Sequence, residues 1–111
     1  MTEADREYFE EVSSQDALGV VVFTAPWCGF CHSMEKVCHS VMGDFPRVHF
    51  CRVDIDKHKE IAEQYAVKSV PTTLAFCGGR VVSRRTGLMK KSELFEMLSE
   101  CQRIQTTDSL I

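Results

Sequence analysis

Residues 18–31 are Leu-Gly-Val-Val-Val-Phe-Thr-Ala-Pro-Trp-Cys-Gly-Phe-Cys, and this stretch decides the fold. Its first seven residues form a continuous run dominated by β-branched and aromatic side chains, which is typical of a parallel strand buried on both faces. From Cys31 to about Met42, apolar residues recur at positions 31, 34, 38, 41 and 42, which predicts a helix with one buried stripe. The cysteines Cys28 and Cys31 therefore lie where a buried strand passes into a helix.

The rest of the chain alternates between further predicted helices and strands. We expect helices over about Thr2–Ser14, Lys57–Ala66 and Lys90–Ile104, and strands over Arg47–Asp56, Thr72–Cys77 and Arg80–Thr86. Thr2 and Asp56 are the expected helix caps, and Gly78-Gly79 predicts a tight hairpin turn. This order predicts an α/β fold in which a right-handed βαβ unit and a hairpin build one mixed sheet with helices on both faces.

The bulk composition fits a single domain over residues 1–111. Hydrophobic residues make up 44% and charged residues 26% of the chain, and a chain of this length can bury one core. A net charge of −3 gives no electrostatic reason to bind nucleic acid or an anionic membrane, and no apolar stretch of about 18 residues predicts a membrane span.

Residues 1–5 lack the basic and apolar regions of a secretory signal, so we expect a cytoplasmic protein. We expect the tail from about residue 105 to fray.

Cys28 and Cys31 have the spacing of a redox pair. In an intracellular chain, cysteines with a function are more often redox-active or metal-binding than structural disulfides. Cys28 should lie at the start of the helix, where free backbone N–H groups and the helix dipole stabilise a thiolate. Cys31 follows one turn later, within reach of a disulfide. The pair predicts a two-step exchange that needs no cofactor: Cys28 attacks a substrate disulfide, and Cys31 resolves the mixed disulfide.

Three segments resemble the thioredoxin superfamily, and the resemblance extends over about Tyr8–Glu100. They are residues 21–31 (VVFTAPWCGFC), 53–56 (VDID) and 65–72 (YAVKSVPT), followed by glycines at 79 and 87. The resemblance implies a thioredoxin fold with about four helices. Because few residues precede the first predicted helix, we expect the N-terminal edge strand to be short or absent and the sheet to have four strands.

The resemblance also implies a substrate site around the cysteine pair. Pro71 is implied to be a cis-proline that faces the dithiol. The implied substrate surface is formed by Trp27, Gly29, Phe30, Val70, Pro71 and Gly87. Val70 would offer its backbone to an extended segment of the substrate, which is a short form of strand addition. The implied partners are disulfide-containing proteins and an upstream reductase, and we expect the chain to be a monomer.

Three residues depart from the usual family pattern. Phe30 replaces the proline of thioredoxins and the histidine of disulfide isomerases, which predicts a reduction potential of roughly −180 to −270 mV. Val22 replaces a buried aspartate that relays protons to the inner cysteine, and Arg52 replaces the lysine partner of that aspartate. We therefore expect proton removal from Cys31 to depend on water or another group, with slow release of the mixed disulfide near neutral pH.

Several alternatives remain open at this stage. One alternative is that the fold serves as a binding or chaperone-type module with weak redox activity. A zinc site could combine the cysteine pair with Cys38 or His39, but Cys31 and Cys38 are separated by roughly 10 Å along a helix, which is poor tetrahedral geometry. A metal cluster shared between two chains and a haem attached at Cys28–His32 are further alternatives. The other four cysteines, Cys38, Cys51, Cys77 and Cys101, are expected to be packing residues, with a regulatory thiol as the alternative for each.

Overall fold

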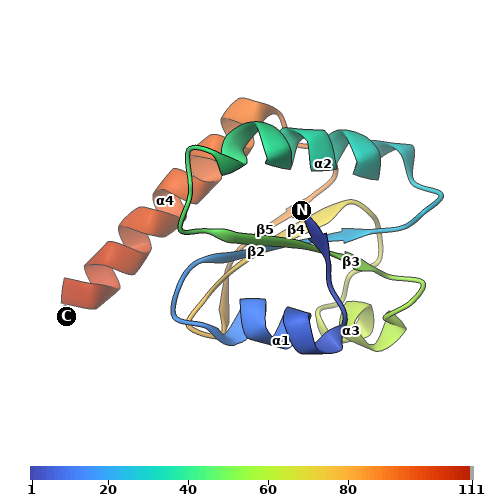
Figure 1. The fold of residues 1–111 in the computed structure, drawn as a ribbon, viewed down its shortest axis with the longest axis horizontal. Helices are drawn as coiled ribbons and strands as arrows, with labels where there is room; N and C mark the ends of the chain where they lie inside the picture. The colour runs from blue at the N-terminus through green and yellow to red at the C-terminus, as the bar shows by residue number, and fades with distance from the viewer. Residues whose placement is uncertain (111) are drawn as a thin grey trace.

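Strand β2 (Gly19–Thr24) lies at the centre of a five-stranded mixed sheet (Figure 1). The computed structural model describes the backbone of residues 1–110 and the side chains as far as Arg103. In chain order the elements are β1 (Thr2–Glu3), α1 (Arg6–Ser14), β2, α2 (Gly29–Met42), β3 (His49–Asp54), α3 (Lys59–Gln64), β4 (Thr72–Cys77), β5 (Arg80–Thr86) and α4 (Lys91–Leu110). The strand order is β1-β3-β2-β4-β5, in which β1, β3 and β2 are parallel and β4 and β5 are antiparallel to their neighbours.

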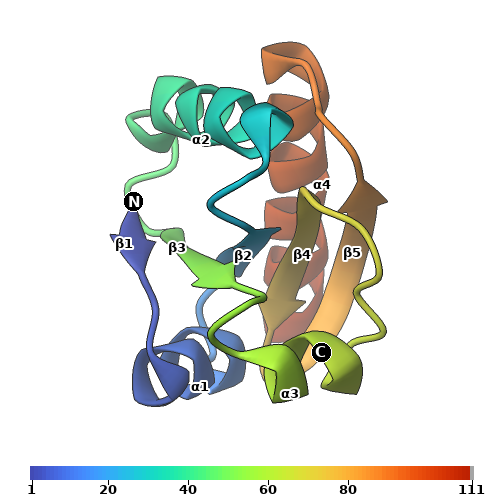
Figure 2. The same cartoon turned by 90° about the vertical axis from the view of Figure 1, so that its right-hand side faces the viewer.

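Helices cover both faces of this sheet (Figures 1 and 2). Val20 and Val22 of β2 pack into a core with α2 and α4, whereas Val21 and Phe23 pack into a second core with α1 and α3. All six residues of β2 are buried, because each side of the strand meets a helical layer. The continuous apolar run in the sequence is therefore explained, and the predicted thioredoxin-type architecture is confirmed.

The N-terminal strand is present, so the sheet has five strands rather than four. Thr2 and Glu3 pair in parallel with Cys51 and Arg52 of β3, which makes β1 as short as the sequence suggested. The following helix α1 begins at Arg6 and not near Thr2. Its cap is Asp5, whose side chain accepts a hydrogen bond of 2.8 Å from the backbone N–H of Tyr8.

Helix α3 is shorter than predicted, and Asp56 is not its cap. His58 occupies the N-cap position without a capping hydrogen bond from its side chain. The turn before it is held by Asp54, whose carboxylate accepts hydrogen bonds from the backbone N–H groups of Asp56 at 2.8 Å and Lys57 at 3.3 Å. The side chain of Asp56 is thereby left to accept a hydrogen bond from the Trp27 indole.

The other elements lie close to their predicted positions. Strands β4 and β5 have the predicted bounds, and α2 begins at Gly29, two residues before the predicted start. Helix α4 continues to Leu110, beyond the predicted end at Ile104, and fraying of the tail stays a prediction. Among the helices that the structure describes, none is long and apolar enough to cross a membrane.

Candidate active site

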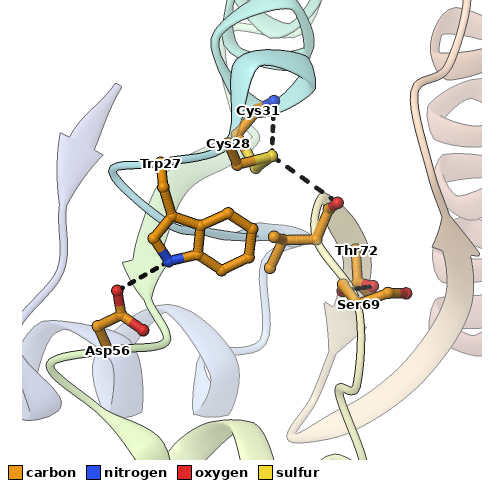
Figure 3. The surroundings of a disulfide bond; sticks show 7 residues. Trp27, Cys28, Cys31, Asp56, Ser69 and Thr72 are labelled. Carbon is orange, nitrogen blue, oxygen red and sulfur yellow. Dashed lines mark hydrogen bonds between the residues drawn. A yellow bond between two sulfur atoms is a disulfide. The ribbon is translucent and has the colours of Figure 1, made fainter.

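The cysteine pair lies at the junction between β2 and α2 (Figure 3). Cys28 is the N-cap of α2 with extended backbone angles, and Cys31 lies in its first turn. The two residues form a disulfide across a Cα–Cα distance of 5.3 Å. Both are largely shielded, with exposed fractions of 6% for Cys28 and 3% for Cys31. The strand-to-helix step therefore brings the two sulfurs together as the spacing predicted.

The first turn of α2 favours a negative charge on Cys28. The backbone N–H of Cys31 donates a hydrogen bond to the Cys28 Sγ at 3.1 Å. This donor and the positive end of the helix dipole both stabilise a thiolate at the N-cap. Of the two sulfurs, the one on Cys28 therefore lies where the helix start favours a thiolate.

Val70 and Pro71 face the pair from the loop before β4. The bond between them is cis, as the resemblance implied, and the carbonyl oxygen of Val70 lies 3.8 Å from the Cys28 Sγ. Two hydrogen bonds fix the end of this loop that adjoins β4. The Thr72 hydroxyl donates to the Ser69 carbonyl at 2.7 Å, and the Gly87 backbone N–H donates to the Pro71 carbonyl at 2.8 Å. The second bond brings Gly87, with its positive φ of 93°, to the same edge of the site.

Two aromatic side chains stand in solvent beside the pair. Trp27 and Phe30 are 69% and 67% exposed, although aromatic side chains are largely buried on average. The Trp27 indole donates a hydrogen bond of 3.1 Å from its Nε1 to the Oδ2 of Asp56, so its ring is oriented although it is exposed (Figure 3). The sequence prediction placed Trp27 and Phe30 at the site but missed the role of Asp56. The position of Asp56 in the VDID segment was the signal in the sequence that could have placed it at the site.

The position of the expected buried acid is filled by the apolar side chain of Val22. Val22 is fully buried and pairs in register with Arg52 of β3. The guanidinium of Arg52 forms an ion pair with the carboxylate of Glu35 on α2, and it also approaches Glu3 of β1 at 3.8 Å. The structure therefore contains a charge pair in this region, but its acid comes from the helix and not from the central strand. Sequence analysis missed Glu35.

The remaining cysteines lie apart from the pair. Cys38, Cys51 and Cys101 are buried, whereas Cys77 at the end of β4 is partly exposed. Burial raises the pKa of Cys38 and of Cys51 to about 12, and it also raises the pKa of Cys101. In the part of the chain that the structure describes, no three His, Cys, Asp or Glu side chains are grouped as metal ligands. Cys38 packs in the core between α2 and the sheet.

Comparison with known proteins places this site in a family. The Thioredoxin family model matches residues 1–100. The chain belongs to the thioredoxin family. It is 37% identical over 95 residues to a thioredoxin of Chlamydia trachomatis, which covers 84% of this chain and 93% of that protein. It is 30% identical over 97 residues to thioredoxin 2 of Chlorobaculum tepidum, covering 86% and 89%.

Solved thioredoxin structures share the fold. A thioredoxin from Trypanosoma brucei brucei superposes with a TM-score of 0.82 at 29% identity, covering 93% of this chain and 90% of that one. A thioredoxin from Nicotiana alata gives 0.76 at 32% identity, covering 86% and 82%. Together with the Cys28–Cys31 disulfide, these similarities identify the thioredoxin-family chain as a thiol–disulfide oxidoreductase. Its general partners are disulfide-containing proteins and a reductase.

Proposed function

We propose that the chain reduces disulfides in other proteins, with Cys28 as the nucleophile and Cys31 as the resolving thiol. The observation that carries this assignment is the placement of Cys28 at the N-cap of α2, where the backbone N–H of Cys31 points at its sulfur at 3.1 Å. The Cys28 thiolate attacks one sulfur of the substrate disulfide, and the other substrate sulfur leaves as a thiolate. Cys31 then attacks Cys28, the mixed disulfide breaks, and the second substrate thiol is released.

The surface around the pair supports a role in substrate binding. Trp27 and Phe30 offer exposed apolar area, while Gly29 leaves the helix start open, with no heavy atom within 4 Å of the position where a Cβ would lie. On the opposite side, Val70 and Pro71 present backbone to the same region, and Gly87 lies next to them through its hydrogen bond to Pro71. An extended substrate segment would lie between these two sides with its disulfide over Cys28.

Cell location, assembly and electron source are part of the same proposal. Four cysteines are free thiols in the structure, which fits a reducing compartment such as the cytoplasm. The dithiol and its surroundings come from one chain, so the protein would act as a monomer and be returned to the dithiol form by an upstream reductase. Cell fractionation would test the location, and recovery of the protein outside the cell would contradict it. Sedimentation would test the assembly state, and a stable dimer would contradict the monomer.

The decisive experiment is turnover of a protein disulfide, such as those of insulin, by wild type and two serine variants. Cys28→Ser should reduce turnover to the buffer background, because no thiolate attacks the substrate. Cys31→Ser should also lose turnover but accumulate a mixed disulfide with the substrate, visible by mass spectrometry without reductant. Binding of substrate with no turnover by wild type would instead favour the binding or chaperone-type alternative.

A further inference from the structure

A cavity lies beside the resolving cysteine. It has a volume of about 200 Å³ and lies between the start of α2 and the carboxyl ends of β2 and β3. The ionisable residues that line it are Glu3, Cys31, His32, Glu35, Arg52 and Asp54. A cavity of this size with polar walls has room for several water molecules. It therefore offers a polar route to Cys31, whose side chain is otherwise closed to solvent.

Glu35 and Cys31 are neighbours on this wall of the cavity. They are four residues apart on α2, which places their side chains next to one another on the same face of the helix. Arg52 of β3 holds the Glu35 carboxylate through the ion pair. The guanidinium is itself fixed, because it donates a hydrogen bond of 3.1 Å to the carbonyl of Met1. The carboxylate is thus oriented toward the cavity that it shares with the resolving thiol.

The resolving step needs a proton acceptor, and the sheet beneath Cys31 supplies none from β2. Cys31 attacks as a thiolate, so its proton must leave before or during the attack. Val22 has no group that can take this proton. Because Cys31 is 3% exposed, the acceptor must act from within the cavity, directly or through water.

The other charged groups around the cavity have different roles. Asp54 accepts two backbone hydrogen bonds that hold the turn before α3. Glu3 is engaged by Lys57 at 2.9 Å as well as by Arg52. His32 is exposed at the rim. Glu35 is the remaining carboxylate, and it lies on the same helix as the thiol that it would serve.

We propose that Glu35 accepts the Cys31 proton during resolution and that Arg52 is its positioning residue. This rests on the proposed function of the pair. The Cys31 thiol gives its proton through cavity water to the Glu35 carboxylate, and the Cys31 thiolate attacks the Cys28 sulfur. The Cys28–Cys31 bond forms as the Cys28–substrate bond breaks. The substrate sulfur leaves with the electron pair and takes up a proton, so the protein dithiol loses the two electrons that the substrate gains.

A single-turnover reaction with an aromatic disulfide separates the two steps. Each step releases one coloured thiol, so the absorbance shows attack by Cys28 first and resolution by Cys31 second. In Glu35→Gln, we expect the first rate to be unchanged and the second to fall by about a hundredfold at pH 7, the lower end of general base catalysis. The second rate should then rise about tenfold per pH unit, because Cys31 must ionise without help. Glu35→Asp should recover part of the rate.

Three comparisons make the result specific. Glu96→Gln, the same change on the outer side of α4, should leave both steps unchanged. Arg52→Lys should keep the pH profile near that of wild type, whereas Arg52→Met should shift it toward that of Glu35→Gln, which a purely structural role would not do. Circular dichroism at each pH confirms that the variants are folded.

Two results would overturn the proposal about Glu35 and leave the proposed reductase function intact. If Glu35→Gln resolves at the wild-type rate and with the wild-type pH profile, Glu35 is not the acceptor. If Asp54→Asn alone slows resolution, the acceptor is on β3. Failure of the wild-type protein to release even the first thiol would instead contradict the proposed reductase function.

Discussion

At the scale of single residues, burial divides the cysteines into two chemical groups. The pair at the start of α2 has a backbone donor beside its outer sulfur, whereas Cys38 and Cys51 are enclosed by apolar side chains. A pKa of about 12 leaves roughly one thiol in 10⁵ ionised at pH 7. The six cysteines of the sequence therefore divide into the Cys28–Cys31 pair, three buried thiols of low reactivity and the partly exposed Cys77.

Alkylation of the native, oxidised protein tests this division. Iodoacetamide should label Cys77, which is partly exposed, well before Cys38, Cys51 or Cys101, because burial suppresses the thiolate and blocks access at those three. Peptide mass spectrometry gives the extent of labelling at each position. In denaturant, all four should react at similar rates. Native labelling of Cys38 or Cys51 as fast as that of Cys77 would contradict the assignment.

The sequence predicted those contacts of the site that are local in the chain. Cys28, Cys31, Trp27 and Phe30 lie within five residues, so spacing alone brought them together. The partner of Trp27, Asp56, follows a different strand, and Glu35 pairs with Arg52 only because α2 lies over β3. No periodicity in a single sequence reports such pairings, which depend on how the elements are placed in three dimensions.

At the scale of elements, α1 packs closely against the start of β2. A Cβ at Gly19 would lie 2.5 Å from the carbonyl oxygen of Val12 and 2.8 Å from one of its methyl groups. Gly19 therefore lets the helix approach the sheet without a gap. Val12 is itself 1% exposed, so the contact has no free space into which it can relax.

Gly19→Ala should consequently destabilise the fold by about 1–3 kcal/mol, the usual cost of overpacking. Urea unfolding gives the change in free energy. Gly43→Ala is a matched control, since its Cβ would meet nothing within 4 Å and its φ of −64° suits any residue. That variant should be neutral or slightly stabilised. Equal loss of stability in both variants would show that the close approach is not the cause.

Element boundaries were harder to predict than element types. A strand of two residues, such as β1, is too short to show alternation, and its existence depends on pairing with β3. The start of α3 was misplaced because Asp56 has the right chemistry for a cap, while the structure uses Asp54 to hold the turn instead. The hairpin bounds of β4 and β5 were correct because Gly78 and Gly79 fix the turn locally.

At the scale of the whole molecule, the buried thiols link stability to alkaline pH. The folded pKa of Cys38 and Cys51 is about 12, above the ordinary value of 9.0 that applies when the chain is unfolded. Below about pH 9 the two thiols are neutral in both the folded and the unfolded chain, so their ionisation does not lower the free energy of unfolding. Between about 9 and 12 only the unfolded chain ionises, and the free energy of unfolding falls as the pH rises.

Urea unfolding of the protein between pH 8 and 10.5, under anaerobic conditions, should show this fall. Each thiol can contribute at most about 1.4 kcal/mol per pH unit. Cys51→Ala should make the decline shallower. The raised pKa of Lys57, caused first by its hydrogen bond to Glu3, acts above its ordinary value of 10.5 and so lies outside this range. A slope unaffected by Cys51→Ala would contradict the linkage.

The sheet ends at β5, which therefore presents an open strand edge. An open strand edge is a template on which a second copy can add its own strand, which is how ordered aggregates start. Strand β5 carries Arg80, Arg84 and Arg85, and Arg84 is tied to the loop before β4 by a hydrogen bond of 2.9 Å to the Ala66 carbonyl. A second β5 laid along the first would bring arginines together. The arginines of β5 thus place like charges along this edge, which disfavours the addition of a second copy there.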